Sequence, residues 1–239
     1  MIPKEILSTN SNDAGKIDGG ESVGKEKMKL LDLMIREQQR DNQDLLAHET
    51  VASGTTFAIF LLASNPEEQA KVQFELDSVF GEDRSRDIQP SDLPKPKYLE
   101  CCFKETLRLY PPAPVMFRSI EKDLQLDEKV TIPSGIQVVI SPWVTHRIPE
   151  IFPEPEKFDP TRFMPENCIE RHPYAFIPFS AGPRNCMGQK IAIVKAKIIL
   201  AHIFRNFTVE LDSPAETMVP IGDMILYPKG GLKIKLKQR

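Results

Sequence analysis

The sequence Phe179-Ser180-Ala181-Gly182-Pro183-Arg184-Asn185-Cys186-Met187-Gly188 decides how the rest of the chain is interpreted. Apolar residues at helical spacing predict a long helix over about 187–207, so Cys186 is expected at a helix N-terminus. The positive end of the helix dipole and free backbone N–H groups stabilise thiolate over thiol at such a position. Gly182 permits a tight turn, and Gly188 permits close approach of a flat ligand. Taken alone, the alternative is a buried structural cysteine beside a turn.

Proline punctuates the chain before this stretch. The 239 residues contain 21 prolines against 12 glycines, and sixteen of the prolines lie between residues 90 and 183. Proline fixes φ and removes an N–H donor, so this part is predicted to be largely irregular backbone and turns. A loop as long as 142–183 inside a folded domain is uncommon and is usually functional.

Regular elements are predicted on both sides of the prolines. Hydrophobic periodicity and breaker residues predict helices over about 29–36, 42–64, 66–81 and 98–110, and strands over 124–126, 129–132 and 136–140. Asn65-Pro66-Glu67-Glu68 combines a cap, a proline at the first helical position and acids in the first turn. A C-terminal hairpin is expected over 225–237, around Pro228-Lys229-Gly230-Gly231. Residues 1–28 have almost no large apolar groups and are expected to be a flexible segment ahead of a domain over 29–239.

Composition and charge exclude several classes of protein. Apolar residues make up 41% and charged residues 27% of the chain, and the net charge is −3. These values are near the averages for a folded soluble chain and exclude a wholly disordered, collagen-like or strongly basic nucleic-acid-binding protein. Cys101 and Cys102 are adjacent and the chain has no Cys/His metal spacing, so reduced thiols are expected rather than a disulfide framework. No apolar run reaches the roughly 18 residues of a membrane span.

Three motifs in order resemble those of the cytochrome P450 monooxygenases. Phe179, Gly182, Arg184, Cys186 and Gly188 match the family's haem-binding loop, F-x-x-G-x-R-x-C-x-G. Upstream, Glu105-Thr106-Leu107-Arg108 resembles the family's E-x-x-R helix, and Phe158-Asp159-Pro160-Thr161-Arg162-Phe163 resembles its later P-x-R-F segment. The resemblance runs over about 29–239 and is strongest to the fatty-acid ω-hydroxylase branch of animals, family 4. It implies the C-terminal half of that fold, mainly α with small β sheets (α+β), without the family's membrane anchor.

The resemblance assigns a haem site to the cysteine loop. Cys186 would be the axial ligand of haem iron, and Phe179 would pack beside its thiolate. Arg184 and Arg118 would contact the haem propionates. In this branch the Leu46 position is often a glutamate that can become ester-linked to haem, so non-covalent haem b is expected here.

A proton path and a buried charge cluster are implied as well. Glu49-Thr50 aligns with the acid–threonine pair that delivers protons to bound oxygen, although a threonine in the middle of a helix often only bonds back to a carbonyl. Glu105, Arg108 and Arg162 would form a structural triad, since Glu105 and Arg108 lie at i, i+3 on one helix face. An exposed, weak ion pair is the alternative for such a pair.

Substrate and partners follow from the same resemblance. The substrate would be a fatty acid or another lipophilic molecule, contacted by Ala113, Pro114, Val115, Met224 and Ile225. Electrons would come from NADPH through a flavoprotein reductase that docks near Cys186, for example on Lys190, Lys195 or Lys197, and possibly from a cytochrome b5-type donor. The expected location is the cytosolic face of the endoplasmic reticulum membrane. Two alternatives stay open: a truncated, non-catalytic fragment with weak or no haem binding, and a reductase-independent haem-thiolate isomerase, against which Glu49-Thr50 argues.

Overall fold

A computed structural model describes residues 44–81, 83–84, 86–222 and 224–239, with side chains from His48 onward. All of these residues belong to one compact unit, Asp41–Arg239. The predicted flexible segment 1–28, the predicted helix over 29–36 and the side chain of Leu46 lie outside the described residues.

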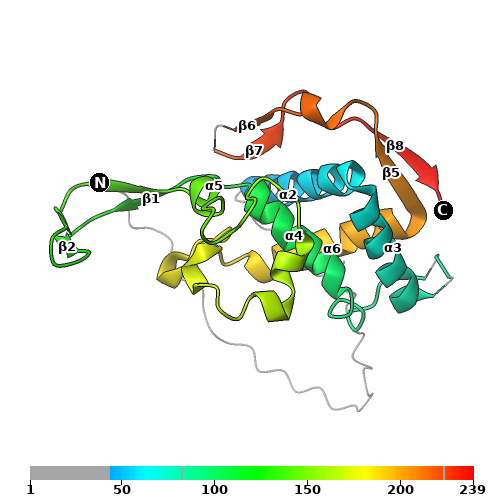
Figure 1. Cartoon of the computed structure of the whole chain (residues 1–239), viewed down its shortest axis with the longest axis horizontal. Helices are drawn as coiled ribbons and strands as arrows, with labels where there is room; N and C mark the ends of the chain where they lie inside the picture. Colours follow the sequence, from blue (N-terminus) through cyan, green and yellow to red (C-terminus); the bar gives the residue numbers. More distant parts are fainter. Residues whose placement is uncertain (1–43, 82, 85, 223) are drawn as a thin grey trace, which may run out of the picture. The chain divides into compact units, whose positions relative to one another are not determined.

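Four long helices form the interior of this unit: α2 (Asp44–Ser64), α3 (Pro66–Phe80), α4 (Lys97–Leu109) and α6 (Gln189–Asn206). Each of them contacts the other three (Figure 1). The second half of α2 is apolar nearly all round, which predicts burial on most sides, and Phe57 and Leu62 are fully buried. Leu76 of α3, Leu99 of α4 and Leu200 of α6 are fully buried as well.

The helix α3 begins where the sequence predicts, but Asn65 does not cap it. Pro66 is the first helical residue, Glu67 and Glu68 lie in the first turn, and Gly81 ends the helix with φ 70°. The side chain of Asn65 makes no cap bond; its Nδ2 donates instead to the carbonyl of Leu61, at 2.8 Å, at the end of α2. Asn65 therefore terminates one helix rather than capping the next.

The strands of the described residues form four antiparallel pairs. The pairs are β1 (Met116–Ser119) with β4 (Gln137–Ile140), β2 (Leu124–Gln125) with β3 (Thr131–Ile132), β5 (Phe207–Leu211) with β8 (Ile234–Gln238), and β6 (Pro220–Gly222) with β7 (Leu226–Pro228). The predicted hairpin over 225–237 is wrong, because its two arms pair with different earlier strands. The consecutive glycines Gly230 and Gly231, with φ 74° and 79°, carry the chain from one pair to the other.

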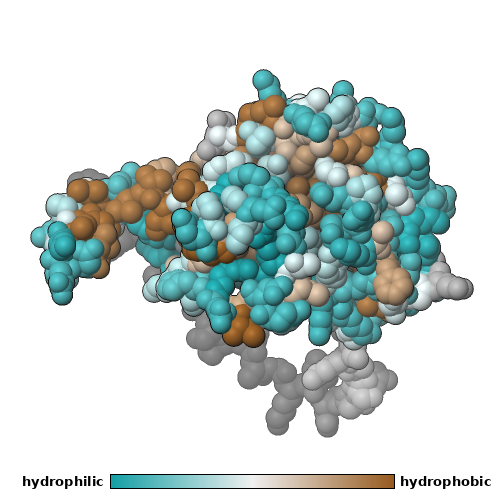
Figure 2. Space-filling model, viewed as in Figure 1, coloured by the Kyte–Doolittle hydropathy of each residue, from teal (hydrophilic) through white to brown (hydrophobic). Residues whose placement is uncertain are grey.

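The β1–β4 ribbon alternates between exposed and half-buried residues and has no fully buried one. Figure 1 shows it running out from the helices, and Figure 2 shows hydrophobic residues gathered along it. Phe117 and Val139, which are directly opposite in the ladder, are both 56% exposed.

The proline-rich stretch is irregular, as predicted, but it is ordered by short turns. A one-turn helix α5 (Pro142–Thr145) and four 3₁₀ turns lie within it: η1 (Pro160–Phe163), η2 (Pro165–Asn167), η3 (Pro173–Ala175) and η4 (Gly182–Arg184). Ser141, Asp159 and His172 cap three of these elements with side-chain oxygen or nitrogen atoms. The segment η1 packs on α4, so the coil is held against the helix that carries Glu105 and Arg108.

Candidate functional site

The loop that carries Cys186 is closed by its own backbone. The Ser180 N–H donates to the Ile177 carbonyl at 3.0 Å, the Asn185 N–H to the Gly182 carbonyl at 3.1 Å, and the Cys186 N–H to the Phe179 carbonyl at 2.9 Å. Gly182 has φ 75° and Ser180 has φ 64°, so both residues lie in the left-handed region. A side chain at Gly182 would strain this turn, which explains the glycine at that position.

The Cys186 side chain is exposed, and the alternative of a buried structural cysteine is therefore wrong. The helix α6 begins at Gln189 with Gly188 as its N-cap, two residues later than predicted, so Cys186 precedes the helix by three positions. A Cβ added at Gly188 would lie 3.8 Å from the Cys186 sulfur, an ordinary contact. Within the chain itself, space therefore does not require glycine at 188.

Phe179 and the two arginines have different environments. Phe179 is half-buried and packs against the hydrophobic core; it also lines a cavity of about 90 Å³ behind the loop, together with Phe103, Leu107 and Ile193. Arg118 of β1 donates to the Ser180 hydroxyl at 2.7 Å, which ties the ribbon to the cysteine loop. Arg184 is exposed.

Glu105, Arg108 and Arg162 lie together in the interior. Arg108 binds the Glu105 carboxylate in a bidentate manner, with Nε–Oε2 at 2.7 Å and Nη2–Oε1 at 2.8 Å, and both side chains are 0% exposed. Arg162 Nε lies 3.5 Å from Glu105 Oε1, and the Asp159 N–H donates to the same oxygen at 2.9 Å. The alternative of an exposed pair is excluded.

The remaining donors of Arg108 hold the proline-rich coil. Its Nη1 donates to the carbonyls of His146 and Pro155 at 3.0 and 2.6 Å, and its Nη2 to the carbonyl of Lys157 at 3.1 Å. Burial raises the pKa of Glu105, while the hydrogen bonds and charge of Arg108 oppose that rise. The bidentate contact favours the ionised carboxylate, because a neutral Glu105 would leave the buried charge of Arg108 unpaired.

Glu49 and Thr50 lie near the start of the described part of α2, where Glu49 is exposed and Thr50 is half-buried. One turn later, the Ser53 hydroxyl donates to the carbonyl of Leu226. The Leu226 N–H donates to the carbonyl of Pro112 at 2.9 Å. The backbone of Leu226 therefore joins α2 to the segment that follows α4.

This clamp brings together the residues expected to contact substrate. Ala113 and Pro114 directly follow Pro112 and are half-buried, and Val115 is 38% exposed. Met224 and Ile225 directly precede Leu226; Met224 is 75% exposed and Ile225 is half-buried.

The prediction that Lys197 docks a reductase is wrong. Lys197 is buried, and its Nζ donates to Glu100 Oε2 at 2.9 Å, so it cannot meet a partner surface. Lys190 is exposed and Lys195 is half-buried. The four cysteines are free thiols, as expected. None of the described helices is long and apolar enough to cross a bilayer.

Two residues that organise the site, Ser53 and His146, were not identified from the sequence. Ser53 is one of several hydroxyl residues in α2, and its separation from Leu226 along the chain hid their contact. His146 is fully buried, and its Nε2 accepts the N–H of Ile177 at 2.9 Å. A histidine just after Ser141-Pro142, in a coil of prolines, gave no signal of a buried acceptor.

Comparisons with known proteins agree with this geometry. Residues 44–236 match the cytochrome P450 family. Cytochrome P450 4c3 of Drosophila melanogaster is 40% identical over 236 residues, which cover 93% of this chain and 44% of that protein. Cytochrome P450 4V2 of Homo sapiens is 42% identical over 256 residues, which cover 100% of this chain and 48% of that protein. The chain thus spans less than half the length of these curated relatives.

Solved structures give the same result. A crystal structure of the cytochrome P450 CYP102L1 superposes with a TM-score of 0.76 at 28% identity, covering 82% of this chain and 44% of that one. Retinoic-acid-bound cyanobacterial CYP120A1 gives a TM-score of 0.74 at 29% identity, covering 80% and 43%. The predicted fold class, part of a mainly α fold with small sheets, is confirmed, and so is the predicted similarity to family 4. The family match extends over most of the chain, and the chain belongs to the cytochrome P450 family.

Proposed function

We propose that the protein is a haem-thiolate monooxygenase that inserts one oxygen atom of O₂ into a lipophilic substrate and releases the other as water. One observation carries the proposal: the Cys186 thiol is exposed on a loop that its own backbone holds closed. Free cysteines are usually buried, so an exposed thiol on a closed loop is better placed to meet a ligand than to pack in the core.

The residues present fit a haem group. Cys186 offers a soft, exposed sulfur donor, and Arg118, already bound to Ser180 of the same loop, offers a cation for a carboxylate at the edge of the ring. Arg184 offers a second exposed cation. We infer that these residues hold non-covalent haem b, with Phe179 packed behind the loop and glycines at 182 and 188. When bound, haem supplies the redox-active iron for oxygen activation.

The chain's own residues would handle protons and substrate. We propose that the Glu49 carboxylate exchanges protons with solvent, since it is exposed, and passes them to the Thr50 hydroxyl one residue further into α2. Ala113, Pro114 and Val115 on one side, and Met224 and Ile225 on the other, would contact an apolar substrate. The Leu226 clamp supports this role, because it fixes the two segments to each other.

Partners and location are proposed from family membership. A fatty acid or a xenobiotic-like molecule is the proposed substrate class. Electrons would come from NADPH through a flavoprotein reductase, with a cytochrome b5-type protein as a further donor, and Lys190 remains an exposed candidate for docking. The proposed location is the cytosolic face of the endoplasmic reticulum membrane.

A second candidate is a non-catalytic fragment with weak or no haem binding. The observations that favour it are the apolar ribbon, with Phe117 and Val139 each 56% exposed, and Met187 beside Cys186, 99% exposed. Exposed apolar groups of this kind normally meet a partner surface.

One experiment separates the two candidates. The purified chain is reconstituted with hemin, reduced, and saturated with carbon monoxide. A strongly red-shifted Soret band supports the monooxygenase, and a spectrum equal to that of free haem supports the fragment. Cys186→Ser should abolish the shifted band, whereas the control Cys168→Ser should retain it. Acid-solvent extraction then tests non-covalent attachment, because ester-linked haem would stay with the chain.

A further inference from the structure

We propose that His146 is a positioning residue for the Cys186 loop, and that its Nε2 atom does this by accepting the N–H of Ile177. The proposal deepens the proposed function, because it concerns how the sulfur is held. His146 touches none of the reacting groups; it acts through the backbone of the segment that leads into the loop.

The contacts form a continuous path from the buried pair to the sulfur. Arg108, fixed by Glu105, donates to the carbonyl of His146 at 3.0 Å. The ring of the same histidine accepts the Ile177 N–H at 2.9 Å. The Ile177 carbonyl then accepts the Ser180 N–H at 3.0 Å, and the Phe179 carbonyl accepts the Cys186 N–H at 2.9 Å. Each bond fixes the next stretch of backbone.

The state of the ring follows from its contacts. An N–H donor at Nε2 requires a lone pair there, so the neutral ring carries its proton on Nδ1. Burial lowers the pKa of His146 to about 4; the charges of Arg108 and Arg147 add to the lowering, and the carbonyls of Leu107 and Arg108 partly oppose it. The ring also packs against Phe176, with centroids 5.1 Å apart. The acceptor is therefore available at neutral pH.

The two ring nitrogens are not equivalent, which makes the proposal testable. Among the described residues, Nδ1 has no partner at hydrogen-bonding geometry, whereas Nε2 has Ile177. Glutamine places an amide oxygen near the position of Nε2, and asparagine places one near the position of Nδ1. Phenylalanine preserves the ring volume but offers no acceptor. A positioning role therefore predicts rescue by glutamine alone, and a packing role predicts rescue by phenylalanine.

The first measurement uses the haem-free chain, so that it is independent of haem binding. Amide hydrogen exchange at Ile177 and over 180–186 is compared between the parent, His146→Gln, His146→Asn and His146→Phe. We expect exchange roughly tenfold faster in the asparagine and phenylalanine variants, as for the loss of one buried hydrogen bond, and near-parental exchange in the glutamine variant. His202→Asn, at an exposed position of α6, is the matched control and should change nothing.

Two outcomes would overturn the proposal: parental exchange in the phenylalanine variant, or exchange in the glutamine variant as fast as in the asparagine variant. If the variants fail to fold, the tautomer of His146 in the parent chain decides by nitrogen NMR, since a proton on Nε2 contradicts the proposal. After hemin reconstitution, the red-shifted fraction of the reduced, carbon-monoxide-bound pigment should fall in the same order. Equal spectra in all variants would overturn the link between His146 and the sulfur. A parent chain without the red-shifted band would contradict the proposed function. In that case hydrogen exchange over 180–186 alone would decide the role of His146.

Discussion

The two regions that carry the family's motifs are built in opposite ways. Around Glu105, the central ion pair is buried and bound by the chain itself, and Glu105 and Arg108 are 0% exposed. Around Cys186, the backbone is closed by hydrogen bonds, but the sulfur and Met187 face outward. The first region is complete without a ligand, whereas the second supplies a rigid frame whose side chains are free to meet one. Stability should therefore depend on the first region and chemistry on the second.

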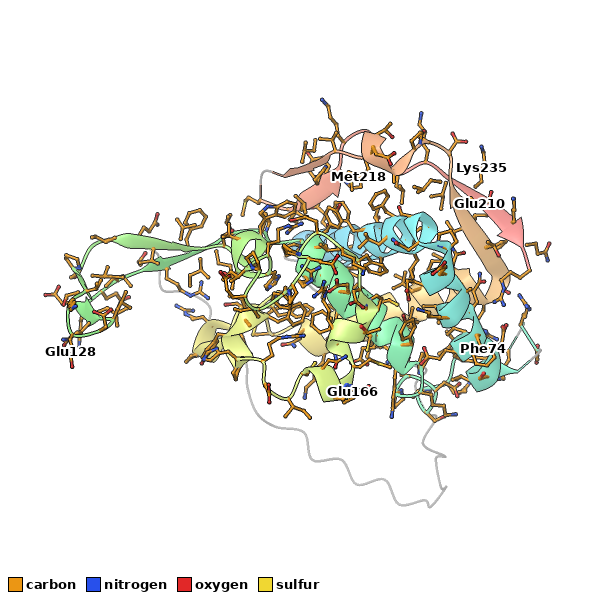
Figure 3. All side chains as sticks on the ribbon, in the orientation of Figure 1. Phe74, Glu128, Glu166, Glu210, Met218 and Lys235 are labelled. Atoms are coloured by element: carbon orange, nitrogen blue, oxygen red, sulfur yellow. The ribbon has the colours of Figure 1, made fainter. Side chains whose placement is uncertain are left out.

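Replacing Glu105 should have the largest effect on stability. Glu105→Ala leaves the Arg108 guanidinium buried without its carboxylate, and removing one partner of a buried pair costs about 3–5 kcal/mol. We expect the free energy of unfolding, measured with urea, to fall by that amount. The matched control is Glu166→Ala, at an exposed residue of η2 that Figure 3 labels, where a change within about 0.5 kcal/mol is expected. A loss under about 1 kcal/mol at Glu105 would remove the contrast between the two regions.

The histidine that links the regions should make stability depend on pH. The pKa of His146 is lowered from 6.5 to about 4 by burial first and by the neighbouring arginines second. Between these two pH values the unfolded chain binds a proton at His146 that the folded chain does not bind. Stability therefore falls as the pH falls through this window, and His146 does not affect it above the window. The full effect is on the order of 3 kcal/mol.

Urea unfolding at several pH values across this window measures the effect. His146→Gln should flatten the dependence, because glutamine keeps the acceptor for Ile177 and does not titrate. His202→Gln should leave the dependence unchanged, since His202 is exposed. An equally steep dependence in His146→Gln would assign it to other groups.

The clamp at Leu226 should contribute less. Ser53→Ala removes the hydroxyl that donates to the Leu226 carbonyl and leaves that carbonyl without this donor, at a cost of about 1–2 kcal/mol. Hydrogen exchange should rise around Leu226 but not in the cysteine loop. Thr55→Val is the control, because the Thr55 hydroxyl donates to carbonyls of its own helix, those of Val51 and Ala52. Equal effects of the two changes would show that Ser53 does not join the segments.

Local signals in the sequence predicted the two motif regions well, and long-range contacts explain what they missed. The bounds of α3 followed from Pro66 and Gly81, and the helix after Cys186 was predicted, although it begins two residues later than expected. The C-terminal hairpin was wrong because local alternation says nothing about partners: β7 pairs with β6, directly before it, and β8 pairs with β5 across the segment 212–233. The sequence around Lys197 is typical of a surface lysine, and only the fold shows that Glu100 of α4 lies beside it.

The smallest expected effect on stability, at Cys186, gives the strictest test of the contrast between the Glu105 and Cys186 regions. In the haem-free chain, Cys186→Ser should change the free energy of unfolding by less than about 0.5 kcal/mol, because an exposed sulfur is replaced by an exposed hydroxyl. Cys102→Ser is the matched control: that thiol is 1% exposed in α4, and burial raises its pKa well above the usual range, so a hydroxyl there should cost about 1–3 kcal/mol. Urea unfolding of both variants measures the difference. If the two serines were equally costly, the sulfur of Cys186 would belong to the core that stabilises the fold, and a ligand could reach it only by disrupting that core.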